Sequence, residues 1–306
     1  MKPIVCLAGA TGTGKSAAAL ALAERFSGVI INADSRQTYR DFPIITAQPD
    51  TAEQASCPHR LYGFLQTADK LSAGSWRELA VREIETAAEG GSLAILVGGT
   101  GLYLQTLTQG IAPIPPVPPE TASAWEERLS REGPQALHRV LVERDPDSAR
   151  RLHPNDGQRI TRALAVLEGT GKPLGHWHSL PLPPPCYRAL FLRLDMPLEE
   201  LTPHLAARIE KMLMGGALEE AQKALEHCAD PGAPGWSGIG CAELFQHLAG
   251  KISLDACRTL WLKNTRAYAK RQITWFRHHG APEAFAPDDT KGMLTRCATF
   301  LAANGP

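Results

Sequence analysis

The sequence lacks several features that would place it in a membrane or a secretory pathway. None of its 306 residues belongs to an apolar run approaching the roughly 20 residues that a bilayer span needs. The seven cysteines form no C-x-x-C pair, which argues against a structural zinc site and a disulfide framework. The first residues enter a strand-like run without a signal-peptide pattern. We therefore expect a cytoplasmic protein, without a membrane span, in a reducing compartment.

Net charge is also absent, because 32 Lys and Arg balance 32 Asp and Glu. Neutrality argues only weakly against a nucleic-acid partner, because charge can be concentrated locally. Residues 258–279 carry six Lys or Arg and no acid. A solvated helix face usually includes acids that pair with its cations at i,i+4 spacing. This run therefore predicts an anion-binding face.

The fold class follows from short apolar runs that alternate with helical segments. Four β-prone runs occupy residues 3–8, 29–33, 93–97 and 189–194. Continuous apolar runs of this length are typical of parallel strands that are buried on both faces. The sequence thus predicts an α/β protein with a P-loop NTPase-like parallel sheet covered by helices.

Two proline-rich segments bracket a different kind of sequence in the middle of the chain. They lie at residues 113–119 and 181–185, and stiff extended connectors have this composition. Residues 122–169 between them show helical periodicity. We expect a core formed by 1–111 and 186–306, with a helical C-terminal part, and a mainly helical insertion domain at 112–185.

The first strand leads into the sequence GATGTGKS, which fits the phosphate-loop pattern G-x-x-x-x-G-K-[ST] and precedes a helical segment. Backbone N–H groups of such a loop surround phosphate oxygens, and the following helix presents its positive end. Lys15 adds a charge, and the Ser16 hydroxyl can bind Mg²⁺. The motif predicts a di- or triphosphate ligand but no particular reaction. Residues 93–97 end in Gly-Gly-Thr-Gly rather than in an Asp, which weakens an NTPase interpretation.

Asp34 follows the second predicted strand. Residues just past the carboxyl ends of parallel strands face the ligand crevice. A carboxylate there can bind Mg²⁺ or accept a proton from a nucleophile. Asp34 can equally cap a following helix, and position alone leaves both interpretations open. Thr100, past the third predicted strand, has the same position relative to its strand and is a weaker candidate for a role in the site.

Several motifs together resemble one family. GATGTGKS is followed in order by NADSRQTYRDFPIITAQP (32–49), PHRLYG (58–63), LVGGTGLYL (96–104), HPNDGQRITRALAVLEGTGKP (153–173) and TRAYAKRQITWFR (265–277). In sequence and order they resemble the bacterial tRNA dimethylallyltransferases, over nearly the whole chain. The phosphate loop alone is unspecific, whereas the last two motifs are close to unique to this family.

The resemblance implies transfer of a dimethylallyl group from dimethylallyl diphosphate to N6 of the adenosine 3′ of the anticodon, with Mg²⁺. It implies that the phosphate loop holds the donor diphosphate rather than ATP. Asp34 would be the general base, and the other catalytic residues would be Lys15, Thr100 and Arg208. The diphosphate would contact Gly9, Ala10, Thr11, Gly12, Thr13, Gly14, Lys15, Ser16 and Arg208, with Ser16 also at the metal.

The tRNA anticodon stem-loop is the implied partner, together with the donor, and we expect a monomeric enzyme. Stretches matching the family place Asp34, Ser35, Arg36, Gln37, Thr100, Gln158, Arg159, Ile160, Thr161 and Arg162 against tRNA. From the acid-free run we add Arg266, Lys270 and Arg271 as clamps on the RNA backbone.

The sequence departs from the family pattern at four positions. Gln48 replaces a usual lysine, Ala122 stands where an arginine is common, and Cys241 and Ala242 replace an aromatic residue and a cation. Each departure removes a possible contact with RNA or phosphate.

Three alternative functions remain open from the residues themselves. A P-loop nucleotide kinase would transfer a phosphoryl group from ATP without tRNA. A prenyltransferase that modifies free adenine nucleotides would not need the helical insertion. A non-catalytic RNA-binding protein would leave the phosphate loop unexplained.

Overall fold

The structure is a computed structural model that describes residues 1–182, 186–279 and 283–303. The chain divides into two compact units, one formed by residues 1–108 and 185–306 and the other by residues 109–184. The sequence predicts the boundaries between core and insertion after residue 111 and after residue 185. The second proline segment predicted at 181–185 lies partly outside the described residues.

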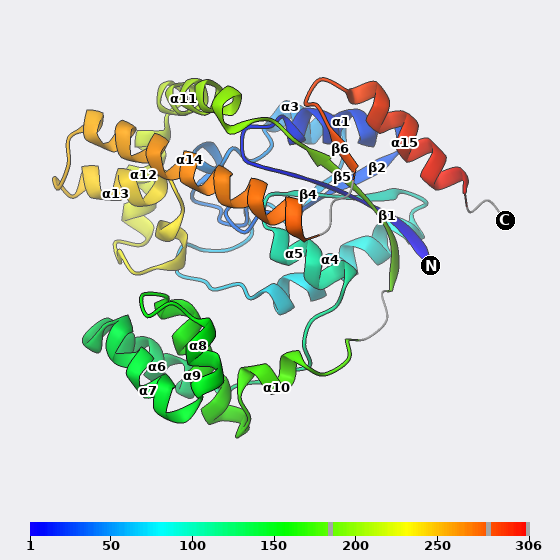
Figure 1. Cartoon of the computed structure of the whole chain (residues 1–306). Coiled ribbons are helices and arrows are strands. Elements are labelled where there is room, and N and C mark those ends of the chain that lie inside the picture. The colour runs from blue at the N-terminus through cyan, green and yellow to red at the C-terminus, as the bar shows by residue number, and fades with distance from the viewer. Residues whose placement is uncertain (183–185, 280–282, 304–306) are drawn as a thin grey trace. The chain divides into compact units, whose positions relative to one another are not determined.

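The first unit is built on a parallel sheet of six strands in the order β3-β2-β4-β1-β5-β6 (Figure 1). The strands are β1 (Lys2–Gly9), β2 (Gly28–Asn32), β3 (His59–Arg60), β4 (Leu93–Gly98), β5 (Tyr187–Leu194) and β6 (Glu283–Phe285). The predicted parallel sheet is confirmed, and its four predicted strands form the middle of it. The short edge strands β3 and β6 were not predicted.

Helices cover both faces of the sheet, which explains why its strands are continuously apolar. On one face α1 (Lys15–Phe26) and α15 (Thr290–Ala302) pack against strand residues such as Val5 and Leu7. On the other face lie α4 (Ala73–Glu89), α5 (Gly101–Thr108) and the end of α14 (Leu254–His278). The rings of Trp76 and Tyr103 stack there at 4.4 Å. Figure 1 shows these two helical layers with the strands between them.

A second apolar cluster joins the helical C-terminal part to the loops after β2. It contains residues from α2 (Pro43–Thr46), α11 (Leu198–Met214), α12 (Ala217–His227), η1 (Pro234–Ser237), α13 (Cys241–Leu248) and α14. Its buried Trp236 packs edge-on against Phe42 and Phe245, both at 4.9 Å. The short helix α3 (Thr51–Ser56) carries a capping box formed by Asp50 and Glu53.

Glu220 of α12 is buried and fastens the start of α2. Its two carboxylate oxygens accept hydrogen bonds from the backbone N–H groups of Ile44 and Ile45, at 2.7 and 2.8 Å. Burial raises its pKa to about 7, although the two N–H groups act in the opposite direction. Because the pKa is higher in the folded than in the unfolded state, folding favours the protonated form of Glu220. The contribution of protonated Glu220 to the free energy of unfolding is complete at low pH and is lost as pH rises through 7.

We therefore expect Glu220→Gln to flatten the pH dependence of stability. In the wild-type protein Glu220 should lower the free energy of unfolding by up to about 3 kcal/mol as pH rises from its unfolded to its folded pKa. Urea unfolding at a series of pH values measures this slope. Glu219→Gln, an exposed neighbour on the same helix, is the control and should keep the wild-type slope. An unchanged slope in Glu220→Gln would contradict the assignment.

The second unit is helical, as predicted for the insertion. Its helices are α6 (Pro119–Glu132), α7 (Pro134–Arg144), α8 (Pro146–Arg151), α9 (Gly157–Thr170) and α10 (Leu174–His178). Three of them begin with a proline, whose missing N–H is not needed in a first turn. Their shared core includes Trp125, Leu137, Leu141, Ile160 and Leu164. In neither unit do the described residues include a helix that is long and apolar enough to cross a bilayer.

Candidate functional site

The phosphate loop lies between β1 and α1, as its motif predicts. Gly12 and Gly14 have φ values of 85° and 84°, a conformation that L side chains rarely adopt. A Cβ atom on Gly9 would lie 2.7 Å from the carbonyl oxygen of Leu194. The N–H groups at the start of α1 have no partner inside the helix and carry its positive end. The loop is therefore shaped to receive an anion.

Lys15 folds back over this loop. Its Nζ donates to the carbonyl oxygens of Gly9 and Ala10, at 3.1 and 2.7 Å. Burial lowers the pKa of Lys15 to about 8, with Asp34 opposing the shift and Arg208 adding to it. A bound anion would favour the ammonium form and raise this pKa again.

Anion binding should consequently weaken as pH rises above 8, where Lys15 becomes neutral in the free protein. We expect the Kd of inorganic pyrophosphate to increase by up to about tenfold per pH unit there, with proton uptake on binding. Calorimetry between about pH 7 and about pH 9 measures both quantities. Lys15→Met is the reference, because any pH dependence of the Kd that remains in this variant comes from titration of the pyrophosphate itself. Equal slopes in the two proteins would contradict this expectation.

Asp34 is held in a turn, and the interpretation of it as a helix cap is wrong. The next helix, α2, begins only at Pro43. The Asp34 Oδ1 accepts the N–H of Arg36 at 2.9 Å, and the Asp34 N–H donates to the buried Asn32 at 2.8 Å. The other oxygen, Oδ2, lies 3.5 Å from where a Cβ atom on Gly99 would stand. Asp34 thus has one oxygen occupied by the turn, and its side chain lines a pocket.

Thr100 joins the ends of β2 and β4. Its Oγ1 accepts the N–H of Ser35 at 3.0 Å and its N–H donates to the carbonyl of Ala33 at 3.2 Å. The Tyr268 side chain also hydrogen-bonds to Thr100, while burial raises the Tyr268 pKa. Thr100 and Ser35 therefore fix the Asp34 turn beside the end of β4.

The pocket that Asp34 lines has a volume of about 240 Å³. Thr11 from the phosphate loop and Arg208 from α11 line it as well. Burial lowers the pKa of Arg208, and Asp34 opposes that shift. Much of the remaining wall is apolar and comes from Ile45, Leu205, Ile209, Met212, Ile239 and Trp261. The structure thus brings together five of the predicted site residues, because Arg36 and Arg271 line the pocket as well, and it adds an apolar wall that the sequence does not predict.

The apolar wall had a weak signal in the sequence. Leu205, Ile209 and Met212 follow the i, i+4, i+7 spacing of a buried helix face. That spacing predicts packing and does not distinguish a core from the wall of a pocket. The adjacent Arg208, a partly buried cation on the same helix, is the feature that indicates a ligand.

Two residues predicted to contact tRNA hold loops of the protein together. Arg36 lines the pocket and donates to the carbonyl of Pro234 at 3.2 Å and to Ser237 Oγ at 2.8 Å. Gln37 Nε2 donates to the carbonyls of Thr46 and Ala47, at 3.0 and 2.6 Å. Both side chains thereby fix segments that border the pocket.

Two of the departures from the family pattern in the first unit, Gln48 and Cys241, have internal roles. Gln48 Nε2 donates to the carbonyl of Tyr39 at 2.7 Å, so its amide supports the turn that follows Asp34. Cys241 is 1% exposed within the apolar cluster of the C-terminal part.

The acid-free run forms most of α14, but acids from other elements reach two of its cations. Arg258 pairs with Glu210 at 3.8 Å, and Arg277 with Asp195 at 3.7 Å. The exposed cations Lys263, Arg266, Lys270 and Arg271 have no ion pair within the described chain. Arg271 also lines the pocket. Fewer cations are thus available for the predicted anion-binding face than the sequence alone suggests.

In the second unit, the predicted tRNA contacts separate into two groups. Gln158, Arg159 and Arg162 are exposed on α9. Ile160 and Thr161 are 0% and 7% exposed and belong to the buried side of the helix. The helical period directs these two side chains into the core of the unit, so the stretch presents Gln158, Arg159 and Arg162 to solvent.

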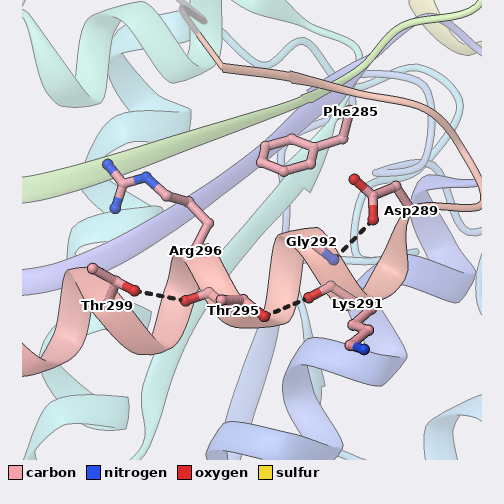
Figure 2. A pocket seen from close by; sticks show the side chains of 7 residues that line it. All are labelled: Phe285, Asp289, Lys291, Gly292, Thr295, Arg296 and Thr299. Atoms are coloured by element: carbon pink, nitrogen blue, oxygen red, sulfur yellow. Dashed lines mark hydrogen bonds between the residues drawn. The ribbon is translucent and has the colours of Figure 1, made fainter.

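A second cavity, of about 490 Å³, lies alongside α15 (Figure 2). It is lined by Phe285, Asp289, Lys291, Gly292, Thr295, Arg296 and Thr299, and contains no predicted site residue. Thr295 and Thr299 donate to carbonyls one turn earlier, and Asp289 caps the helix. Arg296 is paired with Glu283. The polar side chains of Asp289, Thr295, Arg296 and Thr299 are thus engaged within the protein.

The fold and the pocket define a P-loop-type α/β enzyme whose phosphate loop opens onto a partly apolar pocket. Residues 37–279 match the family model described as IPP transferase. The chain belongs to the IPP transferase family, and it is a transferase.

Relatives and solved structures agree with this assignment over nearly the full length. The chain is 55% identical to the tRNA dimethylallyltransferase of Nitratidesulfovibrio vulgaris, covering 97% of this chain and 96% of the relative. It is 45% identical to that of Rhodospirillum centenum, covering 94% and 93%. The full-length tRNA isopentenylpyrophosphate transferase of Bacillus halodurans superimposes with a TM-score of 0.73 at 28% identity, covering 99% and 98%. A eukaryotic dimethylallyltransferase acting on tRNA gives 0.85 at 28% identity, covering 100% and 81%.

Proposed function

We propose that this protein transfers a dimethylallyl group from dimethylallyl diphosphate to N6 of the adenosine 3′ of the anticodon in tRNAs. The observation that carries the proposal is the meeting of Thr11, Asp34 and Arg208 in one pocket with an apolar wall. A diphosphate ester of a short hydrocarbon presents the same two chemistries, an anion and an apolar group. Family membership supports the same reaction.

The proposed reaction is a substitution at the allylic C1 of the donor. The bond from C1 to the diphosphate oxygen breaks, the bond from N6 to C1 forms, and N6 loses one proton. The exocyclic amine is a weak nucleophile, because its lone pair is delocalised into the ring. Catalysis therefore depends on stabilising the departing diphosphate and on removing the proton.

The residues of the pocket can be assigned to these two tasks. Lys15, Arg208 and the amides of the phosphate loop would stabilise the diphosphate. Asp34 would accept the N6 proton through Oδ2, because Oδ1 is engaged by the N–H of Arg36. Thr100 holds the Asp34 turn through Ser35.

Mg²⁺ fits the residues at this site. The described residues contain no group of three or more His, Cys, Asp or Glu that could hold a metal alone. Mg²⁺ commonly takes one or two protein oxygens and completes its shell with substrate phosphates and water. The hydroxyl of Ser16, exposed at the start of α1, is an oxygen ligand of this kind. When bound, the ion would neutralise charge on the leaving diphosphate.

The tRNA adenosine must leave its stack to reach such a pocket. Extruding a base costs a few kcal/mol, which contacts to the RNA backbone can offset. Lys263, Arg266 and Lys270 follow one stripe of α14 at i, i+3, i+7 spacing and are exposed. Gln158, Arg159 and Arg162 offer a second set of exposed polar groups on α9. We propose these as the clamps on the anticodon stem-loop, in a monomeric cytoplasmic enzyme.

One assay separates this function from its alternatives. The purified protein is incubated with radiolabelled dimethylallyl diphosphate and Mg²⁺, together with tRNA, AMP or ATP. Label is expected only in tRNA. Label in AMP would indicate the prenyltransferase of free nucleotides. Phosphoryl transfer from labelled ATP without tRNA would indicate a kinase, and binding of tRNA without transfer would indicate an RNA-binding protein.

A further inference from the structure

Gln272 of α14 contacts both the phosphate loop and the turn after β4. Its side chain is 4% exposed. The Oε1 accepts the backbone N–H of Thr11 at 2.9 Å, and the Nε2 donates to the carbonyl oxygen of Gly99 at 3.0 Å. An amide that is satisfied at both ends has a single favourable orientation, because flipping it would bury two mismatched polar pairs.

The turn that Gln272 holds is itself connected to Asp34. A Cβ atom on Gly99 would lie 2.1 Å from Gln272 Nε2 and 3.5 Å from Asp34 Oδ2. The next residue, Thr100, binds Ser35. Gln272 therefore has the phosphate loop at one end of its amide and the support of Asp34 at the other.

The helix that carries Gln272 is fixed to the sheet independently of any ligand. Arg193 of β5 donates to the carbonyl of Phe276, one turn after Gln272, at 3.3 Å. The Trp275 ring packs so closely that a Cβ atom on Gly101 would lie 2.2 Å from it. The position of Gln272 is thus set by the fold.

We propose that Gln272 is a positioning residue that sets the spacing between the donor's diphosphate and the Asp34 carboxylate, an inference that rests on the proposed function. Because its Oε1 accepts the Thr11 N–H, this N–H is not available to bind phosphate and instead holds the loop in place. Without this link the loop and the Asp34 turn are free to separate. Both the affinity for the donor and the rate of the bound complex then fall, while the tRNA surface is unchanged.

Gln272→Met tests the link, because methionine has a similar length and makes neither hydrogen bond. We expect the KM for dimethylallyl diphosphate to rise about tenfold and kcat to fall about tenfold, with the Kd of tRNA within about twofold of wild type. Asn264→Leu is the matched control. Asn264 lies eight residues earlier on α14 and donates to Glu243 at 2.6 Å. Asn264→Leu should leave the KM for dimethylallyl diphosphate and kcat within about twofold of wild type. Wild-type kinetics in Gln272→Met would overturn the proposal.

A second variant decides the question even if Gln272→Met does not fold. Gln272→Glu keeps an acceptor for the Thr11 N–H, but when ionised it opposes the carbonyl of Gly99 and when protonated it can donate to it. Its activity relative to wild type at the same pH should recover as pH falls. A deficit independent of pH, or none, would overturn the proposal.

The proposed function and this inference fail in different ways. A wild-type protein that transfers no label to tRNA would remove the proposed function. The affinity of the phosphate loop for inorganic pyrophosphate can still be measured in that case. An affinity unchanged in both Gln272 variants would remove the inference.

Discussion

Asp34→Asn should reduce the turnover of tRNA-bound enzyme by about 10²- to 10⁴-fold, the usual contribution of a general base. Asparagine is nearly isosteric, and its Oδ1 can still accept the N–H of Arg36 that holds the turn. The substitution therefore removes the proton acceptor while the local structure is kept. Single-turnover transfer from labelled donor measures the rate, and filter binding should show a Kd for tRNA within about threefold of wild type.

Asp69→Asn is the matched control for this substitution. Asp69 also accepts a backbone N–H within a turn, that of Gln66 at 2.9 Å, and it does not line the pocket. Its turnover should stay within about twofold of wild type. Normal turnover of bound tRNA by Asp34→Asn would exclude Asp34 as the base.

Lys15→Met should weaken the donor, with a KM for dimethylallyl diphosphate raised by about 10- to 100-fold. The ammonium lies over the loop carbonyls of Gly9 and Ala10, where a phosphate oxygen would bring a charge-assisted partner. The KM for tRNA should remain within about twofold, because a single substitution at the loop leaves the exposed stripe of α14 intact. Steady-state kinetics with each substrate varied in turn measures both constants.

Lys2→Met is the control for the loss of a lysine near the same strand. Lys2 lies at the start of β1 and forms an exposed ion pair with Glu85. Such pairs contribute little, so neither KM should change by more than about twofold. A change confined to the tRNA constant in Lys15→Met would contradict the role of Lys15.

The sequence predicts the centre of the fold well, because burial on both faces of a parallel sheet leaves continuous apolar runs. It does not predict β3 and β6, which have two and three residues and so carry no periodic pattern. Their existence depends on pairing with β2 and β5, a tertiary contact. The phosphate loop is predictable because its glycines are local requirements of backbone geometry.

The site is less predictable where it depends on contacts between distant segments. Asp34 was ambiguous until the chain after it proved to be a turn. No motif in the sequence distinguishes Gln272, although a glutamine on the same helix face as Ala269 and Phe276 is a polar residue among buried ones. Its partners, Thr11 and Gly99, are more than 150 residues away in the sequence. Helical spacing can reveal that such a residue is buried, but not what it binds.

The hydrogen bonds from Lys15 to its own loop have a consequence for the end of the reaction cycle. This ammonium donates to the carbonyls of Gly9 and Ala10 and so helps to fix the shape of the loop. In the proposed reaction, the released diphosphate would carry more charge than its ester and would be held strongly. The carbonyls of Gly9 and Ala10 would then compete with the diphosphate for the ammonium of Lys15. In the proposed reaction, this competition would favour release of the product and leave the loop ready for the next donor.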